Sequence, residues 1–273
     1  MNPTGDQDAI ERMTQKILES PKYRNLNIPA DCVRDLVQRE INIQVSPKAA
    51  EKKAKEKLHQ IIAPYLGDPD YPSAGMELQQ AGAEGKAALR SWCEKQLLSH
   101  SSTKERFPVM ESFYQKILDR IGSPKTVLDL ACAMNPFALP WMGLPDSTRY
   151  HAYDLHAPRI HLINAFFSAW GLEPLAEVDD ILLHVPQIEA EAAFFFKEAH
   201  RFENRRKGSN QGFFQQLRCE WIVVTLPSEN LTGQHQMRER QRMLIEKSVS
   251  GQQWDVSEDE IGSEMIFFIR KNG

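Results

Sequence analysis

Five short apolar runs in the second half of the chain constrain its fold more than any other feature. They begin after Lys125 and alternate with helical or loop segments, in the order TVLDLA (126–131), YHAYDL (150–155), AFFF (193–196), WIVVTLP (221–227) and MIFFIRK (265–271). Strands that alternate with helices are typical of α/β sheets, in which crossover helices join parallel strands. We therefore expect an α/β sheet, with the last run pairing antiparallel because it follows residues 255–264 closely.

The first hundred residues have helical rather than strand periodicity. Apolar side chains recur at helical spacing in 8–20 and 30–43, and further helices are expected from Pro47 to about residue 65 and over 85–100. Two prolines and two glycines in 67–76 indicate a loop or a subdomain junction. These patterns predict an all-α N-terminal domain over residues 1–105, followed by an α/β domain over residues 106–273.

Composition and charge narrow the classes of protein. The chain is 41% hydrophobic and 26% charged, as globular proteins are. No apolar stretch approaches the roughly 20 residues of a membrane span. The first residues lack the order of a secretory signal. The four cysteines are far apart and lack metal-ligand spacing, so we expect reduced thiols, no metal and a cytoplasmic protein. The net charge is −4, yet residues 46–60 hold five lysines and two glutamates, which suits either a solvated helix face or a polyanionic partner.

Aspartates stand in the first expected strand, at the end of the second, and in EVDDILL (177–183), about where a further strand should end. They are Asp129, Asp154 and Asp180. Ligands of open α/β sheets bind beyond these ends, where a carboxylate suits a ribose diol and a polar group suits an adenine amino group. The first loop, ACAMNP, lacks the glycines that pyrophosphate binding requires, which favours S-adenosylmethionine over NAD. The alternative is that these aspartates are ordinary turn and cap residues.

The motifs around these aspartates resemble those of one known family. The segment VLDLACAMNPFAL (127–139) is similar to the first-strand motif of the FmrO-type 16S rRNA methyltransferases that confer aminoglycoside resistance. HSSTKER (100–106), PWMGLP (140–145) and EIGSEMIFFIRK (260–271) match further family motifs in the same order. The resemblance covers nearly the whole chain.

The resemblance implies a fold and an activity. Family members have a helical N-terminal domain that binds the 30S ribosomal subunit and a Rossmann-like domain that binds S-adenosyl-L-methionine. They methylate N7 of guanine 1405 in the decoding site of 16S rRNA. Guanine N7 has a free lone pair, so the reaction needs alignment of the two reacting centres rather than a general base.

The resemblance also assigns site residues. Arg106 would bind the methionine carboxylate, Asp154 the ribose, and Asp180 with Ile181 the adenine. The remaining cofactor contacts would be Tyr65, His100, Ser101, Ser102, Ala131 and Phe196. Lys197 is the one cation near the predicted centre, where it would contact the target nucleotide or form a salt bridge with Asp129 or Asp180. The rRNA phosphates would meet Lys48, Lys52, Lys53, Lys55, Lys57 and Arg238.

Three departures from the family pattern leave alternatives open. Ala133 replaces a glycine, a change that ordinary backbone angles would absorb. Glu198 and His200 replace apolar residues beside the expected entrance, and Gln234 and Gln236 stand where the family has cations. The alternatives are a methyltransferase of the same fold that acts on another rRNA position or another RNA, and a catalytically inactive ribosome-binding relative.

Overall fold

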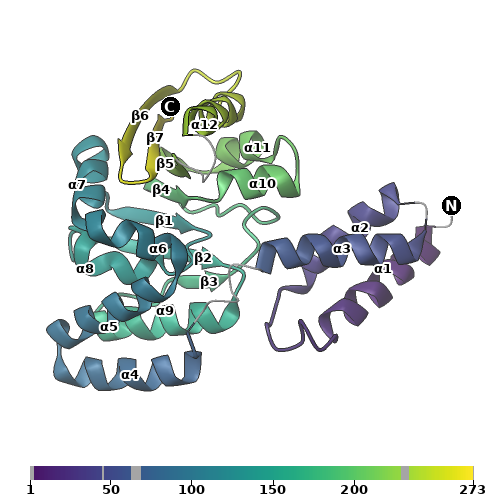
Figure 1. Ribbon diagram of the computed structural model, residues 1–273, viewed down its shortest axis with the longest axis horizontal. Coiled ribbons are helices and arrows are strands. Elements are labelled where there is room, and N and C mark those ends of the chain that lie inside the picture. Colours follow the sequence, from purple (N-terminus) through teal and green to yellow (C-terminus); the bar gives the residue numbers. More distant parts are fainter. Residues whose placement is uncertain (1–2, 45, 63–68, 229–233, 273) are drawn as a thin grey trace.

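The expected sheet forms the centre of the molecule (Figure 1). The computed structural model describes residues 3–44, 46–62, 69–228 and 234–272. Its seven strands lie in the order β3-β2-β1-β4-β5-β7-β6. Their bounds are Thr126–Leu130 (β1), Arg149–Asp154 (β2), Ala176–Val178 (β3), Ala190–Phe196 (β4), Cys219–Pro227 (β5), Asp255–Ile261 (β6) and Glu264–Arg270 (β7). The first five strands run parallel and β7 pairs antiparallel with β5, which confirms the expected arrangement.

Helices cover both faces of the sheet, and two hydrophobic clusters fill the space beneath them. One face carries α4 (Tyr71–Glu84), α5 (Lys86–Ser99), α7 (Met110–Ile121) and α9 (Ala157–Trp170), with the short α6 (Ser101–Arg106) and α8 (Leu139–Met142) beside them. The other carries α10 (Ala199–Arg205), α11 (Ser209–Gln216) and α12 (Gln234–Ser248). The central strands are therefore buried on both sides, which explains why they read as apolar runs.

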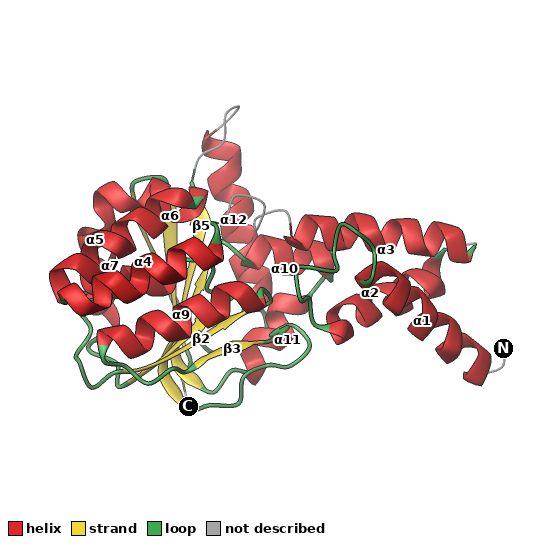
Figure 2. Cartoon of the chain, turned by 90° about the horizontal axis from the view of Figure 1, so that it is seen from below, coloured by secondary structure: helices red, strands yellow, loops and turns green. Residues whose placement is uncertain are grey.

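The first three helices form a separate unit that projects to one side of the sheet (Figures 1 and 2). They are α1 (Pro3–Leu18), α2 (Ala30–Ile43) and α3 (Pro47–Ile62). Their apolar faces meet in their own cluster, which includes Ile17, Leu36 and Leu58. Leu155, which follows β2, packs against that cluster and links it to the sheet. We call α1–α3 the N-terminal unit.

Helices α4 and α5 pack with the sheet rather than with the N-terminal unit. Leu78 and Trp92 belong to the same cluster as strand residues such as Val127, and α4 lies against α9. We therefore infer that the domain boundary lies between Ile62 and Tyr71 rather than at residue 105.

The prediction of a loop was wrong for residues 71–76, because α4 begins at Tyr71. Asp70 caps this helix by accepting a hydrogen bond from the Ser73 backbone N–H at 3.1 Å. Pro72 lies in the first turn, where a missing N–H costs nothing. Among the described helices, none is both long and apolar enough to cross a membrane.

Candidate active site

A cavity of about 810 Å³ opens at the carboxyl ends of the parallel strands. Of the ten residues predicted to bind cofactor, nine line it: His100, Ser101, Ser102, Arg106, Ala131, Asp154, Asp180, Ile181 and Phe196. Lys197 lines it as well, and Lys57, Gln60 and Ile61 of α3 bring the N-terminal unit to its wall. The tenth, Tyr65, lies outside the described residues. The structure thus brings the predicted site together, while the role of each residue stays a prediction.

Asp129 lies beneath the cavity rather than in it. It is 1% exposed and its carboxylate accepts hydrogen bonds from Tyr150 Oη at 2.7 Å and Asn135 Nδ2 at 3.0 Å. Burial raises the pKa of Asp129 to about 7. This aspartate therefore fixes Asn135, which lines the cavity, and does not itself face a ligand there.

The turn after β1 has an unusual backbone. Ala131 and Ala133 adopt φ angles of 53° and 47°, in the left-handed region that disfavours side chains with a Cβ. The backbone angles at Ala133 are therefore not the ordinary ones that would absorb the replacement of glycine. The turn aims the Ala133 N–H at Asp154 Oδ2, 3.0 Å away, so the backbone requirement that glycine meets in the family motif persists here.

Asp154 ends β2 and is held by three donors. Its carboxylate accepts hydrogen bonds from the backbone N–H groups of Ala133 and His156 and from Arg159 Nη1, each at 3.0 Å. The side chain is only 5% exposed and still lines the cavity. Asp154 is thus a fixed anion at the strand end, as a ribose-binding carboxylate must be.

Arg106 makes a buried ion pair that the sequence did not reveal. Its Nε and Nη2 donate to Glu264 at 3.0 and 2.8 Å, and Nη1 donates to Asn135 Oδ1 at 2.9 Å. Burial works against ionisation of Glu264, but the Arg106 guanidinium outweighs it and holds the pKa of Glu264 below its ordinary value. Glu264 belongs to the EIGSEM motif, so the motif was the available signal.

Lys197 pairs with neither of the aspartates considered from sequence. Its Nζ lies 2.8 Å from Glu105 and 3.3 Å from Glu264, and its side chain is 15% exposed. Lys197 directly follows β4 and has a φ angle of 60°, in the left-handed region, so the strand ends at a turn beside the cavity. The ammonium is therefore held near Arg106 by a shared carboxylate, Glu264.

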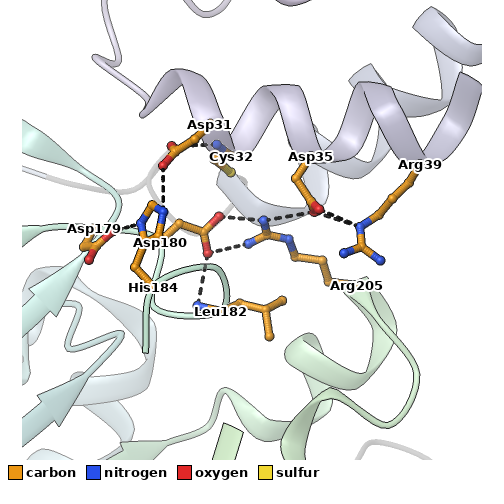
Figure 3. Close-up of polar contacts among 9 residues, drawn as sticks. All are labelled: Asp31, Cys32, Asp35, Arg39, Asp179, Asp180, Leu182, His184 and Arg205. Carbon is orange, nitrogen blue, oxygen red and sulfur yellow. Dashed lines mark hydrogen bonds and ion pairs between the residues drawn. The ribbon is translucent and has the colours of Figure 1, made fainter. Parts of the chain in front are cut away.

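Asp180 also has a partner that the sequence did not reveal. Arg205 of α10 donates from both terminal nitrogens to its two carboxylate oxygens, at 2.8 and 2.5 Å (Figure 3). Ile181, the neighbouring residue, is 4% exposed and forms part of the cavity wall. The predicted adenine contact is therefore part of an ion pair.

The two departures after Lys197 both face the cavity. Burial raises the pKa of Glu198 to about 7 and lowers the pKa of His200 to about 4. Arg201 lies 3.3 Å from Glu198 and partly offsets this effect of burial. The entrance thus holds a carboxyl group that changes charge near neutral pH.

Comparison with known proteins identifies the family. The model of the family described as "Ribosomal RNA methyltransferase (FmrO)" matches residues 19–269. The chain belongs to the FmrO family. A relative from Micromonospora echinospora, named 16S rRNA (guanine(1405)-N(7))-methyltransferase, is 30% identical over 99% of this chain and 100% of its own length. A relative of the same name from Frankia casuarinae is 28% identical over 98% of this chain and 96% of its own length.

Solved structures support the fold of this FmrO-family member. The 16S rRNA methyltransferase RmtF in complex with S-adenosyl-L-homocysteine has a TM-score of 0.79 and 25% identity, over 96% of this chain and 98% of that one. The 16S rRNA methylase RmtB has a TM-score of 0.76 and 26% identity, over 96% and 98%. The prediction of a Rossmann-like methyltransferase domain preceded by helices is confirmed.

The lysines predicted to meet RNA differ in their surroundings within this FmrO-family fold. Lys48 and Lys52 are exposed and form no ion pair with any residue in the described ranges. Lys53 pairs with Glu56 at 2.7 Å, Lys55 with Glu51 at 2.6 Å and Lys57 with Glu40 at 2.6 Å. Arg238 pairs with Glu260, and Gln234 and Gln236 have no described side chains. Ion pairs within the protein thus neutralise the positive charge of some of the side chains predicted to contact RNA.

Proposed function

We propose that the protein is a 16S rRNA (guanine(1405)-N7)-methyltransferase that uses S-adenosyl-L-methionine and confers aminoglycoside resistance. The observation that supports this most is the cavity at the strand ends, lined by nine predicted cofactor contacts and reached by α3. The relatives' printed activity supplies the target nucleotide. The substrate in this proposal is the 30S subunit, so the proposed site of action is the cytoplasm.

The residues of the cavity fit the cofactor. Its volume of about 810 Å³ lies within the range of small-molecule sites, about 300–1,000 Å³. Asp154 would hold the ribose hydroxyls and Asp180 with Ile181 the adenine. Arg106 would bind the carboxylate with the N–H groups that its contacts to Glu264 and Asn135 leave over, since a guanidinium has five donors.

S-adenosyl-L-methionine supplies an electrophilic methyl group, and the protein aligns guanine N7 with it. No general base is required, because N7 carries a lone pair. Phe196 forms the apolar wall of the cavity, and its ring lies 4.8 Å from the Arg106 guanidinium carbon. Lys197 would contact the target nucleotide from its position beside Glu105 and Glu264. Alignment of this kind contributes up to about 7–11 kcal/mol to a bimolecular step.

Methyl transfer to purified subunits tests the proposal. The protein, incubated with methyl-labelled S-adenosyl-L-methionine, is expected to label 30S subunits and not 50S subunits. Its expression in a susceptible bacterium is expected to raise aminoglycoside resistance. Labelling of another RNA would favour a methyltransferase of the same fold with a different RNA substrate. Binding of the cofactor and of 30S subunits without labelling would favour an inactive ribosome-binding relative. Either result overturns the proposal.

The Asp154→Asn variant tests the placement of the cofactor, and the Asp146→Asn variant is its control. Asp154→Asn keeps the shape of the side chain but removes the charge, so cofactor affinity is expected to fall by about tenfold or more. The Asp146→Asn variant changes an exposed aspartate that does not line the cavity and is expected to bind as the native protein does. Equal affinity in all three proteins would contradict the placement of the ribose.

A further inference from the structure

A polar cluster joins the N-terminal unit to the cavity wall (Figure 3). We call it the interdomain cluster. It consists of Asp31, Asp35 and Arg39 of α2, Asp179, Asp180 and His184 of the segment after β3, and Arg205 of α10. The proposed function gives no role to Arg205 or to the α2 residues.

Arg205 is the centre of the interdomain cluster. Its side chain is 8% exposed, that of Asp180 is 2% exposed, and the two form a bidentate pair. The Asp180 carboxylate also accepts a hydrogen bond from the Leu182 backbone N–H at 3.2 Å. A buried, bidentate contact fixes the direction of a carboxylate more strictly than a single hydrogen bond does. Arg205 therefore determines how Asp180 faces the cavity.

The same guanidinium contacts the N-terminal unit. Asp35 Oδ2 lies 3.6 Å from Arg205 Nη2, and Arg39 Nε donates to the Asp35 carboxylate at 2.8 Å. Cys32 of α2 is fully buried beside this cluster (Figure 3), and burial, and then the negative charge of Asp180, raises the pKa of its thiol. Arg205 is thus shared between an acidic residue of the cavity and an acidic residue of α2.

A second, exposed bridge runs beside it. His184 Nδ1 lies 2.8 Å from Asp179 Oδ1, and His184 Nε2 lies 3.5 Å from Asp31 Oδ2. The His184 side chain is 56% exposed, so this bridge contributes little to stability compared with the buried pair. The buried contact through Arg205 is therefore the one that can transmit a change.

Two surfaces of the cavity thus depend on one guanidinium. Asp179, Asp180 and Arg205 line the cavity directly, and Lys57, Gln60 and Ile61 line it from α3, which packs against α2. Asp31 and Asp35 do not line it. A shift of α2 would therefore change both the setting of Asp180 and the position of the α3 wall.

We propose that Arg205 is a positioning residue that couples the placement of the N-terminal unit to cofactor binding, because both of its terminal nitrogens hold Asp180 and one of them, Nη2, also contacts Asp35. This inference rests on the proposed function, because it takes the cavity to bind S-adenosyl-L-methionine. Coupling between two sites is reciprocal. A ligand that fixes Asp180 therefore also favours the orientation of the N-terminal unit in which α3 presents its lysines.

A remote substitution tests the proposal. Asp35→Asn removes one charge from α2 without touching the cavity lining. The Asp35→Asn variant is expected to bind S-adenosyl-L-homocysteine about three- to tenfold more weakly, as measured by the dissociation constant in isothermal titration calorimetry. The KM for S-adenosyl-L-methionine should rise by a similar factor, with kcat unchanged within about twofold. Asp35→Glu keeps the charge and is expected to restore the native affinity.

Glu11→Gln is the matched control. Glu11 pairs with Arg34 between α1 and α2, so this variant also removes an acidic ion-pair partner from the N-terminal unit, but one that forms no ion pair with Arg205 in the described part of the chain. The Glu11→Gln variant is expected to bind S-adenosyl-L-homocysteine with native affinity. A loss of affinity equal to that of Asp35→Asn would show a general effect of loosening the unit and would overturn the proposal.

A double-mutant cycle separates the coupling from a purely structural role. If Asp35 acts through Arg205, then Asp35→Asn should change the affinity for S-adenosyl-L-homocysteine little in an Arg205→Lys background. Lysine lacks the planar, forked guanidinium that contacts both carboxylates. Lysine retains a positive charge beside Asp180, which favours folding. If Arg205→Lys nevertheless fails to fold, the comparison of Asp35→Asn, Asp35→Glu and Glu11→Gln decides the matter alone.

The failure of this inference is distinct from the failure of the proposed function. A native protein that does not bind S-adenosyl-L-homocysteine contradicts the proposed function. A native protein that binds it, together with an Asp35→Asn variant that binds equally well while unfolding at a lower temperature, overturns the coupling and leaves the function intact.

Discussion

Glu198 gives the site a titration near neutral pH. Its side chain is 21% exposed and its pKa is about 7, against an ordinary value of 4.5. Between these two values an unfolded chain loses the proton and the folded protein keeps it, so the free energy of unfolding falls as the pH rises from about 4.5 to 7. The Glu198→Gln variant removes this loss. At pH 8 it is expected to be about 1–3 kcal/mol more stable than the native protein, and equally stable at pH 4.

Denaturant unfolding at both pH values measures the difference. Glu189→Gln, at an exposed carboxylate without an ion pair in the described ranges, serves as the control and should follow the native curve. A constant offset between Glu198→Gln and the native protein at pH 4 and pH 8 would show that burial does not hold this proton.

The turn after β1 stores backbone strain that glycine would relieve. Ala133 has a φ angle of 47°, and an L-residue in the left-handed region costs about 1–2 kcal/mol. Because glycine also has a more flexible unfolded state, Ala133→Gly is expected to gain about 0.5–1 kcal/mol of unfolding free energy. Ala138→Gly, at an ordinary φ of −81° in the same segment, should instead lose about 1 kcal/mol. Losses of similar size in both variants would contradict the strain.

At the level of single residues, the sequence predicted the groups at the strand ends but not their partners. Asp154 was found because it ends an apolar run, and Asp180 because it lies about where a further strand should end. Arg205 was not predicted, because its contact with Asp180 depends on how α10 packs. The Arg106–Glu264 pair joins residues that are 158 positions apart in the sequence, which no local pattern reveals.

Among the elements, α3 is the one proposed to contact rRNA phosphates. Lys48 and Lys52 are exposed without ion pairs in the described ranges, whereas Glu56 and Glu51 already neutralise Lys53 and Lys55. Replacement of Lys48 and Lys52 by glutamine is therefore expected to weaken 30S binding more than replacement of Lys53 and Lys55. The slope of log affinity against log salt should also fall by about 1–2.

Binding to 30S subunits over a salt series tests this expectation, with S-adenosyl-L-homocysteine affinity as the control for folding. Both double variants should keep that affinity. If the Lys53 and Lys55 pair proved the more important one, the ion pairs within α3 would have to exchange for phosphates on binding, and the ranking would be wrong.

Two elements show where pattern reading failed. The prolines near residue 70 suggested a loop, yet Pro72 lies in the first turn of α4, where helices tolerate it. Strand β6 (Asp255–Ile261) was not recognised because it is a largely exposed edge strand of polar residues and has no buried face. By contrast, the central strands were evident from their apolar runs.

For the whole molecule, packing places the domain boundary before α4. Trp92 of α5 packs on Phe137 and Phe166, with ring centroids 5.0 and 6.0 Å apart. Loss of one such core aromatic costs about 3–5 kcal/mol, and a domain has only about 5–15 kcal/mol of stability. A fragment of residues 70–273 is therefore expected to unfold cooperatively, whereas a fragment of residues 106–273, without α4 and α5, should not fold.

Thermal unfolding followed by circular dichroism compares the two fragments. A cooperative transition in the 106–273 fragment would contradict the boundary inferred here. Helical periodicity could not reveal this boundary, because α4 and α5 share it with the N-terminal unit and differ only in what they pack against. The prolines and glycines of residues 67–76 were the available signal of a junction.

The position of the transferred methyl group tests the central claim most directly. Treated 16S rRNA can be cleaved chemically at N7-methylguanine and the break mapped by primer extension, after incubation of 30S subunits with S-adenosyl-L-methionine and either the native protein or Asp154→Asn. The account predicts one break, at guanine 1405, that is strong with the native protein and much weaker with the variant. A break at another nucleotide, or none with a native protein that binds the cofactor, would contradict it.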